Sequence, residues 1–249
     1  MNSDRFRFFS SVYRESDLLI GLSHHFYQPS LEAVCRKEQE RLYALLSDHI
    51  AGNPSFASSL DPLPMPDGPD SLAPEVESMY RCAQASETGP MSSVAGLFAE
   101  AAGKAILGVE ERSAEDTALL DSCEVIVENG GDLFVRNMET LVVVIHAGDS
   151  ALSGKLGLVI PPGEWGICTS SGTHGHSFSK GNADALTIVS RSTPLADAWA
   201  TALANQVMGK EDIPPLLDRI AEIPEILAGV IIAGEEVGIR GDFETKLLS

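Results

Sequence analysis

A tight-turn signal between two short β-type runs limits the fold of this chain more than any other feature. Asn129-Gly130-Gly131-Asp132 separates residues 123–128 from residues 133–136, and both runs carry large apolar side chains. Because Asn and Gly tolerate the positive φ angles of a two-residue turn, the segment predicts an antiparallel hairpin. Other β-type runs lie at residues 6–22, 140–146, 157–160 and 185–190. We therefore expect an α+β fold with a mixed or antiparallel sheet and packed helices, not a doubly wound parallel sheet.

Several segments carry helix patterns around this sheet. They lie at residues 30–50, 73–85, 89–107 and from Thr193 to about Met208, and a further helix follows Ile213. Ser30 is expected to be the N-cap of the first helix. Thr193 is expected to be the N-cap of the fourth, with Pro194 in the first helical position. Loops are expected where Gly, Pro and small polar residues dominate, at residues 53–74 and 166–181.

The charge balance excludes several classes of partner. The 249 residues include 17 Lys and Arg against 36 Asp and Glu, a formal net charge of −19. Such a surface repels phosphate backbones and anionic lipids, so we expect no nucleic-acid partner and no membrane docking. No apolar run reaches the roughly 18 residues of a membrane span, and residues 1–9 lack the apolar run of a secretory signal. The four cysteines form no Cys-x-x-Cys pair, so we expect reduced thiols and a cytoplasmic protein.

Asp197 and Thr201 form the first candidate site. They are four residues apart in an expected helix, so they share one helical face. A carboxylate and a hydroxyl offer hard oxygen ligands of the kind that Mg²⁺ prefers. The alternative, which the spacing alone favours, is that Asp197 complements the helix dipole and Thr201 is half-buried.

The Asn-Gly-Gly-Asp segment at residues 129–132 is the second candidate. Its simplest interpretation is a tight turn between two strands. The functional alternative is that the glycines allow the backbone to approach a ligand closely, while Asp132 binds or orients that ligand.

Two further segments combine glycines with hydroxyl side chains. Residues 168–177 carry five Ser or Thr side chains and two histidines, His174 and His176. Backbone amides in such a stretch can form an anion-binding nest, and a histidine there is a general acid or base candidate. A flexible polar loop is the alternative, and zinc is not expected because no Cys or carboxylate cluster completes a site. Residues 89–96 indicate either a helix N-terminus that faces a phosphate or, equally, tight helix packing.

In their order along the chain, four segments resemble the ApbE superfamily, the FAD:protein FMN transferases, and above all its short, soluble branch. They are GPMSSVAG (89–96), VENGGD (127–132), GICTSSGTHGHS (166–177) and LADAWATAL (195–203). The resemblance implies a T-fold-like α+β architecture in a single domain over residues 1–249. Its parts would be an N-terminal region (6–88), a motif-bearing core (89–208) and a C-terminal extension (209–249).

The resemblance also implies a site. Mg²⁺ would be held by Asp197, Thr201 and the backbone carbonyl of Ala95, and FAD would lie nearby with His176 and Asp132 as catalytic residues. The residues implied to contact the cofactor are Ser93, Asn129, Gly130, Gly131, Asp132, Thr169, Ser170, Ser171, Gly172, His174 and His176.

The chain departs from the family pattern at two places. Where the transferases carry Lys-Gly after the alanine, this chain has Gly96-Leu97, and Lys180 is a candidate replacement for the lost cation. The family's His-x-Ile-Asp-Pro segment is also missing. These differences bear on FMN transfer more than on the fold or on metal and nucleotide binding.

From these features we expect a Mg²⁺-dependent protein that binds a flavin nucleotide and transfers or cleaves at its phosphate. The expected partners are a small-molecule nucleotide, a protein acceptor and further copies of the chain in a homo-oligomer. A non-catalytic flavin- or nucleotide-binding partner protein is the main alternative, and a purely structural subunit is the third.

Overall fold

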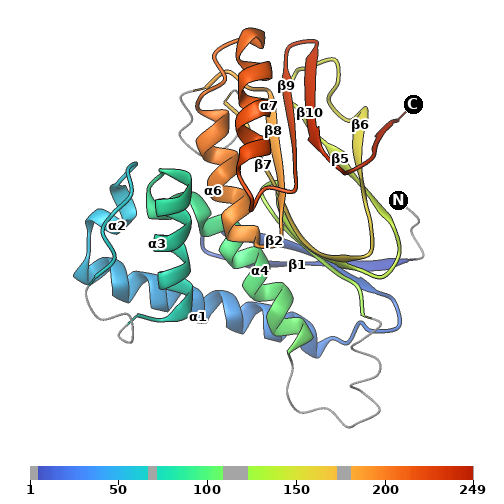
Figure 1. Ribbon diagram of the computed structural model, residues 1–249. Helices are drawn as coiled ribbons and strands as arrows, with labels where there is room; N and C mark the ends of the chain where they lie inside the picture. Colours follow the sequence, from blue (N-terminus) through green and yellow to red (C-terminus); the bar gives the residue numbers. More distant parts are fainter. Residues whose placement is uncertain (1–4, 67–71, 109–122, 173–180, 249) are drawn as a thin grey trace.

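Eight strands form the main sheet of the computed structural model, which describes residues 5–66, 72–108, 123–172 and 181–248 (Figure 1). The order is β1-β2-β3-β4-β7-β8-β9-β10, and each neighbouring pair is antiparallel. The strands span Phe6–Tyr13 (β1), Ser16–Ser23 (β2), Val125–Asn129 (β3), Asp132–Asn137 (β4), Gly163–Ser170 (β7), Ala185–Ser190 (β8), Ala228–Ala233 (β9) and Glu236–Gly241 (β10). A second antiparallel sheet, in the order β11-β6-β5, comprises Leu141–Ile145 (β5), Leu156–Ile160 (β6) and Thr245–Leu247 (β11). The expected α+β class with an antiparallel sheet is confirmed.

The helices gather to the left of and below the strands in Figure 1. They span Ser30–Gly52 (α1), Ser55–Ser58 (α2), Pro74–Ser86 (α3), Val94–Leu107 (α4), Thr193–Ala204 (α6) and Ile213–Glu222 (α7), with 3₁₀ turns at Pro90–Ser93 (η2) and Lys210–Asp212 (η3). Within the described ranges, no helix is long and apolar enough to cross a membrane.

Two expected helix caps are wrong by one residue. Pro29 and Ser192 are the N-caps of α1 and α6, so Ser30 and Thr193 are already helical. The backbone amide of Thr193, the first residue of α6, finds its acceptor on another helix: it donates a 2.7 Å hydrogen bond to Glu100 of α4. Helix α6 also ends at Ala204 rather than near Met208.

The main sheet separates two parts of the hydrophobic core. On its helical face, Leu18, Ile20 and Leu22 of β2 are fully buried and pack with residues of α1 and α4. On its other face, side chains such as Ile167 of β7 pack against Leu158 of β6 in the second sheet. Burying one such Leu or Ile side chain is worth about 1.5–3 kcal/mol. The two layers hold the strands rigidly, which fixes the positions of the loops and turns at the sheet ends.

The expected loop at residues 166–181 is wrong over its first part. Residues up to Ser170 belong to β7, and Ile167 and Cys168 are fully buried in it. Glycine at position 166 is needed because a Cβ atom there would lie 2.5 Å from the Cα of Thr193. The glycine therefore marks a close approach between β7 and α6, not a loop.

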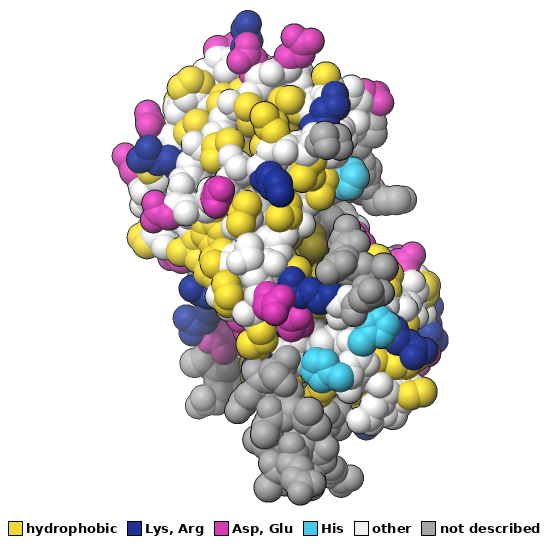
Figure 2. Space-filling model, turned by 90° about the vertical axis from the view of Figure 1, so that its right-hand side faces the viewer, with side chains coloured by type: hydrophobic (Ala, Val, Ile, Leu, Met, Phe, Trp, Pro, Cys, Tyr) yellow, Lys and Arg dark blue, Asp and Glu magenta, His cyan; other side chains and the backbone are white. Residues whose placement is uncertain are grey.

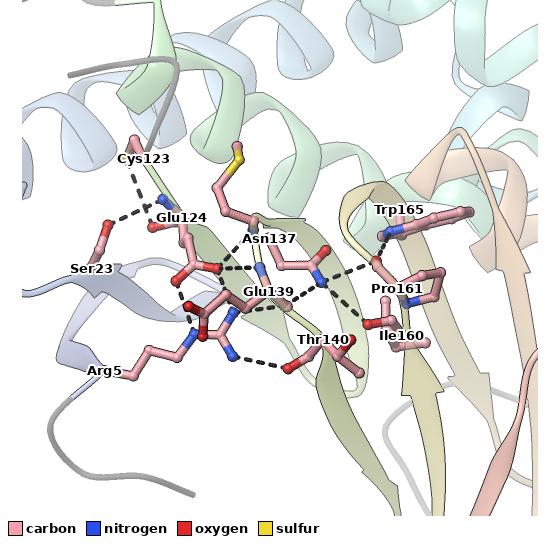
Figure 3. Close-up of polar contacts among 11 residues, drawn as sticks. Arg5, Ser23, Cys123, Glu124, Asn137, Glu139, Thr140, Ile160, Pro161 and Trp165 are labelled. Carbon is pink, nitrogen blue, oxygen red and sulfur yellow. Dashed lines mark hydrogen bonds and ion pairs between the residues drawn. The ribbon is translucent and has the colours of Figure 1, made fainter. Parts of the chain in front are cut away.

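A polar cluster joins the start of the chain to the connection between the two sheets (Figure 3). Arg5 donates to Glu124 at 2.9 Å, and the Met138 amide donates to the same carboxylate at 2.7 Å. Burial alone would raise the pKa of Glu124, but these hydrogen bonds hold it below its usual value. Asn137 donates to the carbonyl oxygen of Pro161 at 3.0 Å. The cluster ties β1 and β4 to the end of β6 and lies apart from the site described next.

Candidate functional site

The first turns of α4 and α6 lie side by side on the helical face of the main sheet, and the turn between β3 and β4 is hydrogen-bonded to the first turn of α4. Asp197 of α6 reaches α4, where its Oδ2 atom accepts a 2.9 Å hydrogen bond from the Gly96 amide. These two residues are 101 positions apart in the sequence. Asp132, the first residue of β4, lies opposite Cys168 in the register of β4 and β7. Two of the predicted segments and Asp197 are thus brought to one junction.

Asp197 lies in an environment that opposes its charge. The residue is only 8% exposed. Burial, and secondly the nearby carboxylate of Asp132, raise its pKa well above the ordinary value, while the amides of Gly96 and Ala95 pull it down. Asp197 is thus an acidic residue at a buried position where desolvation disfavours its charged form.

Asp132 is buried at the same junction. Desolvation raises its pKa to about 7, Glu128 adds to that rise, and a hydrogen bond from the Cys168 thiol opposes it. The Cys168 thiol also lies 3.3 Å from the carbonyl oxygen of Thr193. Because a thiol carries a single proton, Cys168 donates to either Asp132 or Thr193 at any one time. Its own pKa is raised well above the ordinary value, chiefly by burial and then by the two aspartates. Cys168 therefore stays a neutral donor between β4 and α6.

The hairpin predicted from Asn129-Gly130 is confirmed, with Asn129 paired to Asp132 and positive φ angles at Gly130 (64°) and Gly131 (108°). The turn also contacts the site, because the Asn129 side chain donates a 3.0 Å hydrogen bond to the carbonyl oxygen of Ala95. This hydrogen bond joins the β3–β4 turn to the first turn of α4. It also brings Asn129, a predicted cofactor contact, against Ala95, a predicted metal ligand.

Two glycines allow the helices and strands to meet this closely. A Cβ atom on Gly96 would lie 2.6 Å from the Thr193 carbonyl oxygen and 3.0 Å from the Cβ of Asp197. On the other side of Thr193, Gly166 makes the close approach already described. The tight helix packing proposed for residues 89–96 is therefore present. Because the Gly96 amide is bonded to Asp197, it is not available to face a phosphate.

The remaining predicted residues lie around this junction or outside the described residues. Thr169 of β7 shares a 2.8 Å hydrogen bond with Thr187, and the Gly172 amide donates to Ala183 at 2.8 Å. Ser93 is fully buried and donates to the Pro90 carbonyl oxygen at 3.1 Å. Thr201 is partly buried one helical turn after Asp197, and Ser170 and Ser171 are partly buried at and just beyond the end of β7. His174, His176 and Lys180 lie outside the described residues.

Sequence reasoning missed three contributors to the junction: Cys168, Gly166 and Glu100. The first two were assigned to a loop. Glu100 carried a signal of its own, because it is the only acidic residue between positions 89 and 107.

The oxygen atoms at the junction suit a hard cation. Among the residues that the structure describes, no three His, Cys, Asp or Glu side chains are grouped to hold a metal ion. A site here would instead combine Asp197 with the Thr201 hydroxyl, the Ala95 carbonyl and water, as Mg²⁺ sites with few protein ligands do. None of the ion pairs among the described residues includes Asp132 or Asp197. Two buried carboxyl groups that pair with no cationic side chain of the described residues fit a bound cation or a bound proton.

Comparisons with known proteins identify the family and the fold of the chain. The family model described as AbpE bacteria matches residues 1–216. A UPF0280 protein of Methanothermobacter thermautotrophicus is 37% identical over 201 residues, which cover 79% of this chain and 73% of the relative. A UPF0280 protein of Methanopyrus kandleri is 39% identical over 204 residues, covering 79% of this chain and 76% of the relative.

Solved structures share the fold. The ApbE protein of Thermotoga maritima superposes with a TM-score of 0.56 at 12% identity, covering 95% of this chain and 97% of that one. The apo form of the flavinyl transferase ApbE of Pseudomonas stutzeri superposes with a TM-score of 0.54 at 14% identity, covering 96% and 95%. At these identities the likeness concerns the arrangement of helices and strands alone.

Proposed function

This chain belongs to the AbpE bacteria family, and from that premise we propose that it binds a flavin nucleotide together with Mg²⁺ and transfers or cleaves at the nucleotide phosphate. One observation carries the proposal. Asp132 and Asp197 are buried beside each other, and each has a raised pKa. A buried carboxylate pair costs folding energy unless a cation or a proton compensates it.

In the proposed complex, the cation is held by Asp197, the Thr201 hydroxyl and the Ala95 carbonyl. When bound, Mg²⁺ would neutralise charge on the nucleotide pyrophosphate. Asn129 already donates to the Ala95 carbonyl, so it orients that oxygen. The rest of the turn, Gly130 and Gly131, offers backbone without side chains for close approach of the ligand.

Asp132 is the proposed proton acceptor of the reaction. Without a bound cation its pKa is raised to about 7, near the range in which general bases work, and a cation beside it would lower that pKa. It would take the proton from the attacking hydroxyl of an acceptor protein or of water. A new O–P bond would form to the FMN phosphorus, the pyrophosphate P–O bond would break, and AMP would leave. We propose His176 as a second catalytic residue, and Ser93, Thr169, Ser170, Ser171, Gly172 and His174 as further contacts to the nucleotide.

The test is an assay of FAD binding and AMP release with purified protein and Mg²⁺. Asp197→Asn keeps an oxygen for the Gly96 amide but removes the charge, so we expect the same fold with Mg²⁺-dependent turnover reduced by about 100-fold or more. Asp218→Asn on an exposed part of α7 is the matched control and should leave turnover unchanged.

The outcomes separate the candidate functions. Equal turnover in the two variants would contradict the role of Asp197. Saturable FAD binding without AMP release would favour the second function, a non-catalytic flavin-binding protein that acts with a partner. Absence of FAD binding by the unmodified protein would contradict both.

A further inference from the structure

The first turns of α4 and α6 lack caps of their own. The N-cap residues are Ser93 and Ser192, and neither side chain makes a capping hydrogen bond. The first amides of a helix have no partner within the helix, and leaving them unsatisfied in a buried place is costly. Both helices begin at the buried junction described above, so these amides need partners from elsewhere.

Each of the two helices receives its cap from the other. Asp197 of α6 accepts the hydrogen bond from Gly96, the third residue of α4, at 2.9 Å. Glu100 of α4 accepts the hydrogen bond from Thr193, the first residue of α6, at 2.7 Å. On each helix the carboxylate lies four residues after the capped amide, so donor and acceptor share one face. The exchange is reciprocal and fits two helices that run antiparallel at this contact.

The electrostatics and packing of this exchange reinforce each other. Each carboxylate lies at the positive end of the opposite helix dipole, which favours negative charge there. Gly96 sets the spacing, because a Cβ atom would come within 2.6 Å of the Thr193 carbonyl oxygen. The second oxygen of Glu100 pairs with Lys104 on the same helix, and the Glu100 side chain is only 15% exposed. Glu100 is therefore held in one place by contacts on both sides.

We propose that Glu100 is a positioning residue for Asp197, an inference that rests on the proposed function of Asp197 as a cation ligand. Glu100 fixes the start of α6 and thereby fixes where Asp197 lies, four residues further along. Asp197 Oδ2 accepts the hydrogen bond of the α4 cap, so a cation would share this carboxylate with the Gly96 amide. Without Glu100 the first turn of α6 loses its partner, and Asp197 no longer holds its place against Gly96.

The test compares the Mg²⁺ concentration that half-saturates FAD binding in four variants. Glu100→Met keeps the length of the side chain but has no oxygen, so we expect this midpoint to rise about 10-fold, the factor for ~1.4 kcal/mol. Glu100→Gln keeps an acceptor for Thr193 and should stay within about 3-fold of the unmodified protein. Lys104→Met removes the ion-pair partner alone, and Ile106→Val weakens the buried core of α4 alone; both should leave the midpoint unchanged.

Failure of this proposal is distinguishable from failure of the proposed function. A midpoint in Glu100→Met equal to that in Ile106→Val would overturn the positioning role. If Mg²⁺ does not change FAD binding by the unmodified protein, the proposed function fails. The exchange of caps is then tested separately, by urea unfolding of Glu100→Met, Asp197→Ala and the double variant. Because the caps hold one helix pair, the double variant should lose less in urea midpoint than the two single losses together. Additive losses would overturn the exchange of caps.

Discussion

At the residue scale, Asp132 and Asp197 differ from the other described carboxylates in being buried with raised pKa values. Both acids therefore have a higher pKa in the folded state than in the unfolded state, and they stay protonated to a higher pH when the protein is folded. Between the unfolded pKa near 4 and a folded pKa of about 7, the folded state therefore binds more protons. The stability that goes with this protonation is present at low pH and is lost as pH rises through that range.

The first prediction follows from this sign. In the absence of divalent cations, the urea midpoint of the protein should fall between about pH 4 and pH 8, and Asp132→Asn should flatten the fall by an amount worth a few kcal/mol. The control Asp218→Asn removes one exposed acid and tests the effect of net charge alone. Identical pH profiles for the two variants would show that Asp132 titrates as an ordinary exposed acid.

The close approach at Gly96 gives the second prediction. Gly96→Ala places a methyl group against the Thr193 carbonyl oxygen and should destabilise the fold by about 1–3 kcal/mol while weakening the Mg²⁺ response. Gly52→Ala at the end of α1 meets nothing within 4 Å, so its stability should change by less than about 1 kcal/mol. Chemical denaturation of both variants measures the difference. A Gly96→Ala variant as stable as Gly52→Ala would mean that α4 and α6 are not in tight contact.

At the scale of elements, the β3–β4 hairpin was predictable because its turn chemistry is local. Local residue patterns likewise predicted four helices, α1, α3, α4 and α6, with ends displaced by a few residues. The strand β7 was not predicted, because Gly166 and the hydroxyl residues that follow it mark a loop in isolation. Only the position of Thr193 on α6, which no local pattern contains, explains a glycine in that strand.

The hairpin itself provides the third prediction. Gly131 has a φ of 108°, a value that residues with a side chain rarely adopt, whereas Gly130 has a φ of 64°, which Asn tolerates. Gly131→Ala should therefore destabilise the fold by about 1–3 kcal/mol and displace Asp132, while Gly130→Asn should leave the folding stability nearly unchanged. Thermal unfolding of the two variants checks this. Equal behaviour of the variants would contradict the assigned turn geometry.

At the scale of the whole molecule, the resemblance to one family predicted more than the residue patterns could. The patterns indicated an α+β fold, but the pairing of β4 with β7 and the contact of Gly96 with Asp197 join distant segments. Spacing within one helix could not place Asp197 beside Asp132, because that proximity depends on how α6 packs across the sheet. The three-part division of the domain and the homo-oligomeric state stay predictions.

The face of the molecule shown in Figure 2 mixes hydrophobic side chains with scattered charges of both signs. The net charge of −19 opposes self-association, so a homo-oligomer would have to bury uncharged surface. Sedimentation at low and high salt would test this. If the predicted oligomer forms, we expect a species larger than the monomer whose fraction increases with salt. A monomer at every salt concentration would contradict the prediction.

A cation-dependent flavin site is tested by the affinity of the purified protein for FAD at pH 8, measured with Mg²⁺ and with a chelator. At that pH the Asp132 carboxyl, whose pKa is raised to about 7, is mostly charged, so a cation has more charge to compensate than at lower pH. We expect Mg²⁺ to tighten FAD binding by about 10-fold or more. Equal affinity under the two conditions, or no binding under either, would contradict a cation-dependent flavin site at the junction of α4, α6 and the β3–β4 turn.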